Sequence, residues 1–296
     1  MNNNGYISIS IIIPHKNSPN KLVRLLDSIP DNKIIEIIVV DDKSDITLSA
    51  LNLSDDYPYV KFLNNPGPLY DPGSARNYGL NHCAGEWVFF ADADDFFVEN
   101  GVSELIKSLL QINDMVDIVF FKPTSIIERD FSKGVRHTRY SDAIDDFLLN
   151  NNDNSLRYMW SGPVSKLIRK DLLNRKKILF DPQLGCEDVI FSVRSGHYAR
   201  KITCVNTIVY CITESSESLT GRLNSELALK CLSATIRKDE QLLLWNVRTQ
   251  LNWGVTYFLM SQPHKHFVRK SSIYYRFCLF LLKRMFYQAL KSSKNR

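Results

Sequence analysis

The sequence predicts an α/β fold, with a mostly parallel central sheet, flanking helices and a helical extension at the C-terminus. Short runs of β-branched and aromatic residues alternate with segments in which apolar residues recur at helical spacing. The runs are almost continuously apolar, as expected of parallel strands that are buried on both faces. The composition, 44% hydrophobic and 23% charged over 296 residues, is that of a folded globular protein.

The first half of the chain alternates regularly between strands and helices. A strand at residues 7–13 ends at Pro14, and a helix follows that Asn17 or Ser18 can cap, with Pro19 in its first turn. The next strand, at residues 34–40, completes a unit that implies a parallel pair with a right-handed crossover. The other elements predicted here are strands at 60–63, 87–91 and 118–122, and helices at 74–80 and 102–110.

The second half is less regular. We expect a loop or short strand at 160–166, a helix at 169–175, a helix opened by Glu187-Asp188, a strand at 202–212, and a helical pattern from 223 to the end. We therefore predict an α/β domain over residues 1–215 and a helical, basic extension over residues 216–296.

Positive charge is concentrated in the last part of the chain. Ten of the 37 basic residues and none of the 32 acidic ones follow Glu240, so residues 1–240 carry a net charge of −5 and the last 56 carry +10. If residues 276–291 form one helix, it is basic on one face and apolar on the other, which suits an anionic membrane surface. The alternative is a helix packed on the domain with its basic face in water. No nucleic-acid-binding motif accompanies the charge, so we expect no nucleic-acid partner.

The chain shows no secretion signal. Its N-terminus lacks a charged leader followed by an apolar stretch, and the longest apolar run in the tail, 277–282, is far shorter than the ~20 residues that span a bilayer. The six cysteines form no CxxC pair and no zinc-spaced cluster, and we expect them to be reduced. These features predict a cytoplasmic protein, peripheral on the inner face of the cell membrane if the tail binds there.

Carboxylates follow two of the predicted strands. Asp41 and Asp42 end the second strand, and Asp92, Asp94 and Asp95 follow the strand at 87–91. In open parallel sheets, ligands bind beyond the carboxyl ends of the strands. So many carboxylates in one crevice would repel each other without a cation, and oxygen ligands suit Mg²⁺ or Mn²⁺. The alternative for the second group is a helix cap or a turn.

Four segments in the same order and spacing resemble family 2 glycosyltransferases of the GT-A fold. They are Ile-Ile-Ile-Pro-His-Lys-Asn at 11–17, Glu-Ile-Ile-Val-Val-Asp-Asp-Lys-Ser-Asp at 36–45, Gly-Ser-Ala-Arg-Asn-Tyr-Gly at 73–79 and Gly-Glu-Trp-Val-Phe-Phe-Ala-Asp-Ala-Asp-Asp at 85–95. The last contains the DXD motif. The resemblance covers residues 7–125 strongly and continues weakly to Glu187-Asp188. The Pro-His-Lys-Asn variant is similar to bacterial surface-polysaccharide transferases.

The resemblance implies a site for a nucleotide-sugar donor. The donor-binding residues that it implies are Pro14, His15, Asn17, Asp41, Asp42, Arg76, Asp92 and Ala93, and the metal ligands are Asp94 and Asp92. Asp41 would accept a hydrogen bond from the base, and Asp95 would support the turn. The family commonly has a small or aromatic residue in place of His15, which leaves open a buried strand-end histidine. Arg76 could instead be a helix-surface arginine.

The resemblance also implies a general base late in the fold. A carboxylate on the acceptor hydroxyl accelerates transfer by roughly 10²–10⁴-fold, and Asp188, paired with Glu187, matches the family's position for it. The alternative is that these residues cap the helix that they open. On the acceptor side we place Trp160 as an apolar platform and Lys166. The alternatives are a buried core tryptophan and a surface lysine.

The function predicted from the sequence is inverting transfer of a sugar, from a UDP-sugar by resemblance, to an acceptor hydroxyl. We expect this hexosyltransferase to use Mn²⁺ or Mg²⁺ and to act on a glycan or a lipid-linked glycan in the synthesis of capsule, lipopolysaccharide or another surface polysaccharide. Residues 1–215 would be its GT-A-like catalytic domain. The alternatives are a metal-dependent nucleotidyltransferase, which usually has a Gly-rich basic loop that is missing here, and a non-catalytic nucleotide-binding scaffold.

Overall fold

The computed structural model describes residues 8–68, 70–215 and 225–247. The chain divides into two compact units, residues 1–218 and 219–296. The described part of the second unit is helix α8, Ser225–Leu244, and the turn after it. This helix falls within the helical pattern predicted from residue 223. The predicted amphipathic helix at 276–291 lies outside the described residues.

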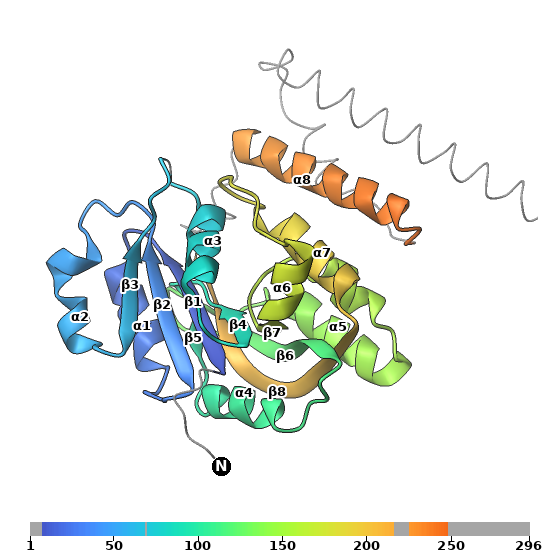
Figure 1. Cartoon of the computed structure of the whole chain (residues 1–296), viewed down its shortest axis with the longest axis horizontal. Coiled ribbons are helices and arrows are strands. Elements are labelled where there is room, and N and C mark those ends of the chain that lie inside the picture. The colour runs from blue at the N-terminus through green and yellow to red at the C-terminus, as the bar shows by residue number, and fades with distance from the viewer. Residues whose placement is uncertain (1–7, 69, 216–224, 248–296) are drawn as a thin grey trace, which may run out of the picture. The chain divides into compact units, whose positions relative to one another are not determined.

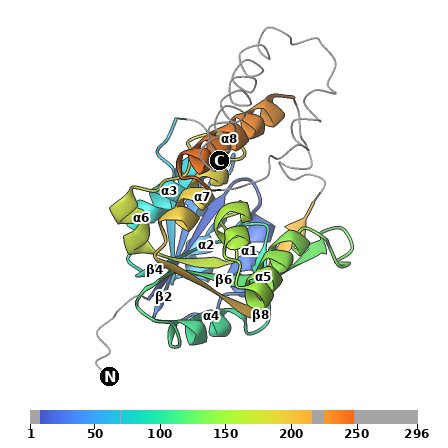
Figure 2. The same ribbon diagram turned by 90° about the vertical axis from the view of Figure 1, so that its right-hand side faces the viewer.

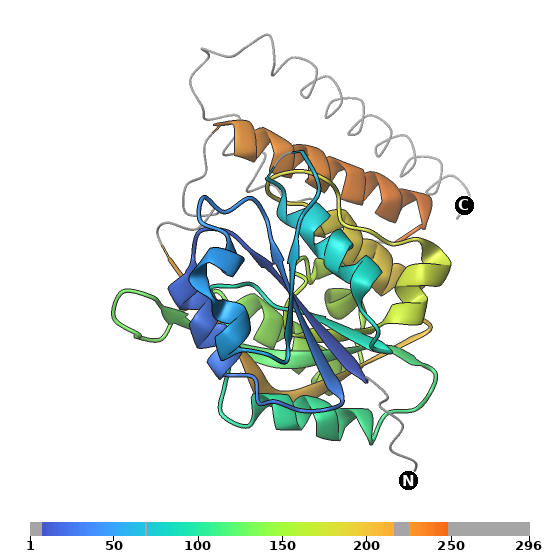
Figure 3. The same cartoon turned by 60° about the vertical axis from the view of Figure 1, so that its left-hand side comes forward.

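The first unit is built on one eight-stranded sheet in the order β3-β2-β1-β4-β7-β6-β8-β5. The strands are β1 Ile9–His15, β2 Ile35–Asp41, β3 Val60–Asn64, β4 Trp87–Phe90, β5 Phe96–Phe97, β6 Val116–Ile127, β7 Lys166–Arg169 and β8 Lys201–Glu214. Strands β3, β2, β1 and β4 are parallel, and β8 is parallel to β6. Strand β7 runs antiparallel to both β4 and β6, and β5 runs antiparallel to β8. The sheet is curled, as Figures 1 and 3 show.

Helices cover both faces of this sheet, which confirms the predicted α/β class (Figure 1). They are α1 Pro19–Asp27, α2 Leu53–Asp56, α3 Pro72–His82, α4 Gly101–Leu109, α5 Thr138–Asn150, α6 Lys170–Lys176 and α7 Asp188–Tyr198, with short turns η1 Leu48–Leu51 and η2 Ser155–Met159. Helix α3 packs on β1 and β2, and α4 packs on β8. In Figure 2, α5 lies over β6, which it contacts.

The central strands form where the sequence is most apolar. Strand β1 pairs with β2 on one side and β4 on the other, and Ile9, Ile11, Ile12 and Ile13 are all fully buried. A strand between two neighbours and covered on both faces has no side left for water, which explains its continuous isoleucine run. Beyond the sheet edge, Asp71 caps α3 by accepting a hydrogen bond from the Gly73 N–H at 3.0 Å.

The second half departs most from the sequence-based expectation. The segment predicted as a loop or short strand at 160–166 is a loop, and the strand β7 begins only at Lys166. Directly before it, Ser165 has a left-handed backbone (φ 57°) although it is completely buried. Helix α5 and strand β5 were not predicted. A strand of only two residues, such as β5, gives little periodic signal.

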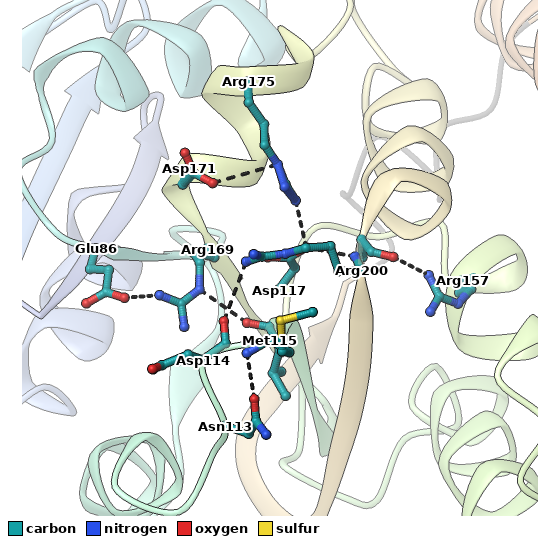
Figure 4. A network of polar contacts seen from close by, with 12 residues as sticks. Glu86, Asn113, Asp114, Met115, Asp117, Arg157, Arg169, Asp171, Arg175 and Arg200 are labelled. Atoms are coloured by element: carbon teal, nitrogen blue, oxygen red, sulfur yellow. Dashed lines mark hydrogen bonds and ion pairs between the residues drawn. The ribbon is translucent and has the colours of Figure 1, made fainter.

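An ion-pair cluster fastens β6 to its neighbours (Figure 4). The fully buried carboxylate of Asp117 lies 2.7 Å from Nη2 of Arg175 on α6 and 2.7 Å from Nη2 of Arg200, which precedes β8. The Arg200 N–H also donates to it at 2.7 Å. Burial alone would raise the pKa of Asp117, but these hydrogen bonds and the charge of Arg175 lower it. Beside the cluster, Arg169 pairs with Glu86.

The thiols only partly follow the expectation. Cys83, Cys204 and Cys211 are free, whereas Cys186 and Cys231 are each disulfide-bonded. The expectation of reduced thiols is therefore wrong for these two, because spacing along a chain does not say which thiols meet in the fold. Within the described residues, no helix has both the length and the apolar character needed to cross a membrane.

Candidate active site

The ends of β1 and β2 bring the first group of predicted residues together. The two strands are parallel, and His15 pairs in register with Asp41. His15 Nδ1 lies 3.4 Å from Asp41 Oδ1, while its Nε2 accepts a hydrogen bond from the Ser18 N–H at 3.2 Å. The ring is 2% exposed, and burial lowers the pKa of His15 in spite of the nearby carboxylate. The histidine is therefore neutral at pH 7, and it is the buried strand-end residue that the sequence left open.

Asp41 and Asp42 both point into protein. Asp41 accepts a hydrogen bond from the Ser44 hydroxyl. Asp42 is 1% exposed and accepts two hydrogen bonds, from Asn65 Nδ2 at 2.7 Å and from the Asp71 N–H at 2.9 Å. Burial raises the pKa of Asp42 nevertheless. Through its two hydrogen bonds, the Asp42 carboxylate links the end of β2 to the loop before α3.

The loop after β1 is fixed by Asn17. Its backbone is left-handed (φ 50°), its N–H donates to Ser44 Oγ at 3.0 Å, and its side-chain amide donates to Asp45 at 3.0 Å. Pro14, still within β1, is partly buried. Lys16, between them, places its ammonium 4.0 Å from the centre of the Tyr70 ring. Asn17 is itself exposed, so its polar groups lie at the surface just beyond the end of β1.

The acidic run follows β4 at the same edge of the sheet. The Asp92 side chain is 37% exposed, and its backbone N–H donates to the Tyr210 hydroxyl at 2.9 Å. Ala93 is buried at 7% exposure. Burial, followed by the charge of Asp92, raises the pKa of Asp94 to about 6. Asp95 is buried and accepts the Thr213 N–H at 2.7 Å. It thus anchors the turn to β8, as the resemblance implies.

Arg76 lies at the centre of the site. It comes from α3, is 5% exposed, and holds Asp92 Oδ1 at 2.6 Å with Nη2 and Glu187 Oε1 at 2.7 Å with Nη1. The helix-surface alternative for this residue is therefore wrong. Its guanidinium, 5.3 Å from the centre of the Phe180 ring, joins the acidic run after β4 to the start of α7. Figure 1 shows α3 and α7 entering this region from different parts of the chain.

Glu187 and Asp188 open α7, as predicted. Two successive left-handed residues, Gly185 (φ 81°) and Cys186 (φ 54°), turn the chain into the helix. Glu187 occupies the N-cap position but makes no side-chain capping hydrogen bond, because its carboxylate is held by Arg76. The capping alternative therefore does not describe Glu187.

Asp188 is the first residue of α7 and is partly exposed. Desolvation by the surrounding protein and the charge of Glu187 raise the pKa of Asp188 to about 7, against the opposing effect of Arg76. A carboxylate with this pKa can take up a proton near neutral pH, which is what a general base requires.

Trp160 and Lys166, which we expected on the acceptor side, are both too buried to contact an acceptor directly. Trp160 is 2% exposed and packs on Phe120 and Tyr140, with ring centres 5.0 and 4.5 Å away. Neither face of its indole is open to a sugar ring in this structure. Trp160 is therefore a core tryptophan, which was the alternative interpretation of the sequence. Lys166 is also 2% exposed, so it is not a surface lysine.

The acidic run fits a divalent cation that is shared with a ligand. No group of three or more His, Cys, Asp or Glu suited to a metal occurs among the described residues. Mg²⁺, however, is usually held by one or two carboxylates together with substrate phosphates. Asp92 and Asp94 supply that number of carboxylates, and the Asp92 side chain is 37% exposed, so that a ligand can approach it.

Sequence reasoning missed several contributors. Tyr70 is close enough to both Asp42 and Glu187 to be affected by their charges. Burial and these two charges raise the pKa of Tyr70 to about 12. Arg24 of α1 donates to the Asp94 carbonyl at 2.5 Å. Neither residue belongs to a motif segment, and no spacing in the sequence indicates them.

Comparisons with known proteins agree with this arrangement. The model of "Glycosyl transferase family 2" matches residues 10–174. The chain is 28% identical over 228 residues to poly(ribitol-phosphate) beta-N-acetylglucosaminyltransferase TarP of Staphylococcus aureus (71% of this chain, 65% of TarP). It is 30% identical over 205 residues to poly(ribitol-phosphate) beta-glucosyltransferase of Bacillus spizizenii (67% of this chain, 31% of the relative). It therefore spans less than two thirds of the length of either relative.

Solved structures show the same fold. The crystal structure of S. aureus TarS 1–349 in complex with UDP-GlcNAc superimposes with a TM-score of 0.60 at 21% identity, covering 78% of this chain and 67% of that one. The GT-A fold inferred from the four motif segments is thus confirmed. With more than half of its length matched by the family model, the chain belongs to glycosyl transferase family 2.

Proposed function

We propose that the chain transfers a sugar, with inversion, from a UDP-sugar to a hydroxyl group of a bacterial surface polymer. The observation that carries the proposal is the cluster in which Arg76 joins Asp92 to Glu187, next to Asp188. One guanidinium thus bridges a proposed donor-side carboxylate and the residue that directly precedes the proposed base, which supports the proposal. We assign this activity to a catalytic domain over residues 1–215.

Asp188 is the proposed general base. Its oxygen accepts the proton of the acceptor hydroxyl as that oxygen attacks the anomeric carbon, and the bond from this carbon to the diphosphate oxygen breaks. Partial exposure allows an acceptor to reach the carboxylate, and a pKa near 7 matches its proton affinity to neutral conditions. Glu187 contributes indirectly, because its negative charge keeps that pKa high.

The donor would lie along the ends of β1, β2 and β4. Asp41 would accept the base imino N–H after the Ser44 hydroxyl turns away, and Asn17 is exposed just beyond the end of β1. Mn²⁺ or Mg²⁺ held by Asp94 and Asp92 would supply Lewis-acid neutralisation of the diphosphate. Arg76 already binds Asp92, and it provides a second positive charge close to the leaving group.

The relatives support a proposal for the acceptor class. TarP and the Bacillus enzyme are named for poly(ribitol-phosphate), and we propose that this chain likewise glycosylates a surface polymer or its lipid-linked precursor. The excess of ten positive charges after Glu240 would favour contact with such a polyanion or with the membrane surface.

A donor screen tests the proposal. The full chain is incubated with UDP-, GDP-, dTDP- and CMP-sugars, with Mn²⁺ or with EDTA, and the released nucleotide is measured. We expect Mn²⁺-dependent release from a UDP-sugar, strongly reduced in Asp92→Asn and Asp94→Asn. The exposed lysine variant Lys107→Gln, in α4, is the matched control and should keep wild-type activity. Absence both of release and of Mn²⁺-dependent nucleotide binding would refute the proposal.

A further inference from the structure

Lys166 is a buried cation that takes no direct part in the proposed transfer reaction. It begins β7, is 2% exposed, and donates one hydrogen bond, to Ser192 Oγ at 3.2 Å. Its ammonium also lies 5.8 Å from the centre of the Phe120 ring. An ammonium group in so dry a place costs free energy unless nearby charge compensates it. Such groups concentrate at functional sites.

The position of Ser192 points to the charged group that lies near this ammonium. Ser192 lies four residues after Asp188 on α7, so both side chains project from the same face of the helix. Ser192 in turn donates to the Ser161 carbonyl at 2.8 Å, which fixes it between the loop before β7 and the helix. The Lys166 ammonium is thereby bound to the residue one helical turn after the proposed base.

The electrostatics agree with this geometry. Burial lowers the pKa of Lys166 to about 7, and the charge of Asp188 opposes that effect. Because an attraction between two charges acts on both, the ammonium also favours the ionised form of the carboxylate. The other charged or titratable groups around Asp188 are Glu187 on its own helix, Arg76 on α3, Asp92 after β4 and Tyr140 on α5.

The backbone around Lys166 is specialised to hold it there. The preceding residue, Ser165, is left-handed and completely buried, and its hydroxyl donates to the Phe121 carbonyl at 3.0 Å. A non-glycine residue in this region is strained, and it persists only where its surroundings fix it. The strain lies directly beside the buried ammonium.

We propose that Lys166 is a positioning residue for the general base: its ammonium, held on Ser192, supplies the interior positive charge that keeps the Asp188 carboxylate ready to receive the acceptor proton. This inference rests on the proposed function. It also replaces the sequence-based expectation that Lys166 contacts the acceptor, since a side chain buried to this degree cannot reach it.

Four variants separate charge from structural support. Lys166→Gln keeps a hydrogen-bond donor for Ser192 and loses the charge, whereas Lys166→Arg keeps the charge. Lys166→Met loses both, and Ser192→Ala removes only the hydrogen-bond partner. Hydrolysis of the UDP-sugar that the wild-type chain uses fastest is measured from pH 5 to pH 9, and thermal unfolding and UDP binding verify that each variant is folded.

We expect the acidic limb of the kcat profile to move to higher pH by at least ~0.5 unit in Lys166→Gln and Lys166→Met, which is roughly a threefold loss at pH 6 and little loss at pH 9. Lys166→Arg should keep the wild-type limb, Ser192→Ala should move it less, and the donor KM should not change. A purely structural lysine would leave the profile of Lys166→Gln unmoved, and that result overturns the inference. Wild-type turnover with an unmoved limb refutes only the role of Lys166, whereas absence of wild-type turnover and nucleotide binding refutes the proposed function as well.

Discussion

Asp117 and Asp188 are two aspartates in the second half of the same domain with opposite behaviour. Asp117 is completely buried, yet the hydrogen bonds and charge from Arg200 and Arg175 overcome burial and lower the pKa of its carboxyl. Asp188 is partly exposed, yet desolvation and the charge of Glu187 raise its pKa to about 7. Burial alone therefore does not decide the charge state of a carboxyl group here.

The difference lies in how each partner is used. Two arginines each direct an Nη2 at the Asp117 carboxylate, although Arg175 also pairs with Asp171 at 3.7 Å, and the cluster fastens β6 to α6 and β8 (Figure 4). Arg76 forms its ion pairs with Asp92 and Glu187, whereas Asp188 forms no ion pair within the described residues. A fully satisfied carboxylate holds the fold, and an incompletely satisfied one can exchange a proton.

The largest expected effect is on catalysis at Asp188. Asp188→Asn keeps the shape of the side chain but cannot accept the acceptor proton, so kcat should fall by about 10²–10⁴-fold with the donor KM little changed. Steady-state release of UDP measures this. Asp117→Asn, assayed per folded molecule, should keep kcat within about threefold. Equal losses of kcat in Asp188→Asn and Asp117→Asn would show that the two aspartates do not differ in their role in catalysis.

The next effect is on stability at Asp117. Replacing it with asparagine leaves two arginines beside a neutral side chain, and breaking a buried ion pair costs about 3–5 kcal/mol. Arg175 and Arg200 are 28% and 40% exposed, so water compensates part of that cost, and we expect about 2 kcal/mol. Urea unfolding at pH 7 checks it, with the exposed Asp31→Asn as the control. A change below about 0.5 kcal/mol would mean that the cluster does not hold the fold.

Trp160 extends the same contrast to an aromatic residue. Trp160→Phe loses packing and the hydrogen bond from Nε1 to the Val164 carbonyl (3.3 Å), which should cost about 1–2 kcal/mol of unfolding free energy. The acceptor KM should change less than about twofold, because the indole is enclosed by protein. A tenfold increase in acceptor KM without loss of stability would instead support the sequence-based hypothesis that Trp160 stacks on an acceptor sugar.

The smallest expected effect is the pH dependence of stability. The raised pKa of Asp188 means that the folded chain takes up a proton between about pH 7 and pH 4 that the unfolded chain does not, so this carboxyl makes the fold less stable at high pH. Asp188→Asn should therefore be more stable than the wild type at pH 8, on the order of 1 kcal/mol, and the gain should vanish towards pH 4. For Asp117 the sign is reversed: its stabilisation is present above pH 4 and is lost as pH falls through its lowered pKa. Thermal unfolding across this range compares the two.

The sequence predicted what local patterns can encode. The strands that became β1, β2 and β4 are apolar runs ending in polar residues, and their ends carry Asp41 and Asp92 as expected. It did not predict that Arg76 pairs with Glu187, because a partner 111 residues away leaves no spacing signal. Burial of Trp160 and Lys166 also depends on contacts with α5 and α7, which no local pattern fixes.

The sheet order has a consequence for how the molecule folds. His15 and Asp41 are 26 residues apart and lie on adjacent parallel strands, whereas β4 pairs with β7 across about eighty residues of intervening chain. Contacts between distant segments cost more loop-closure entropy and form later. Strands β1 and β2 can thus pair while β7 is still unpaired. Pulse-labelled hydrogen exchange during refolding should protect the amides of β1 and β2 before those of β7 and α7.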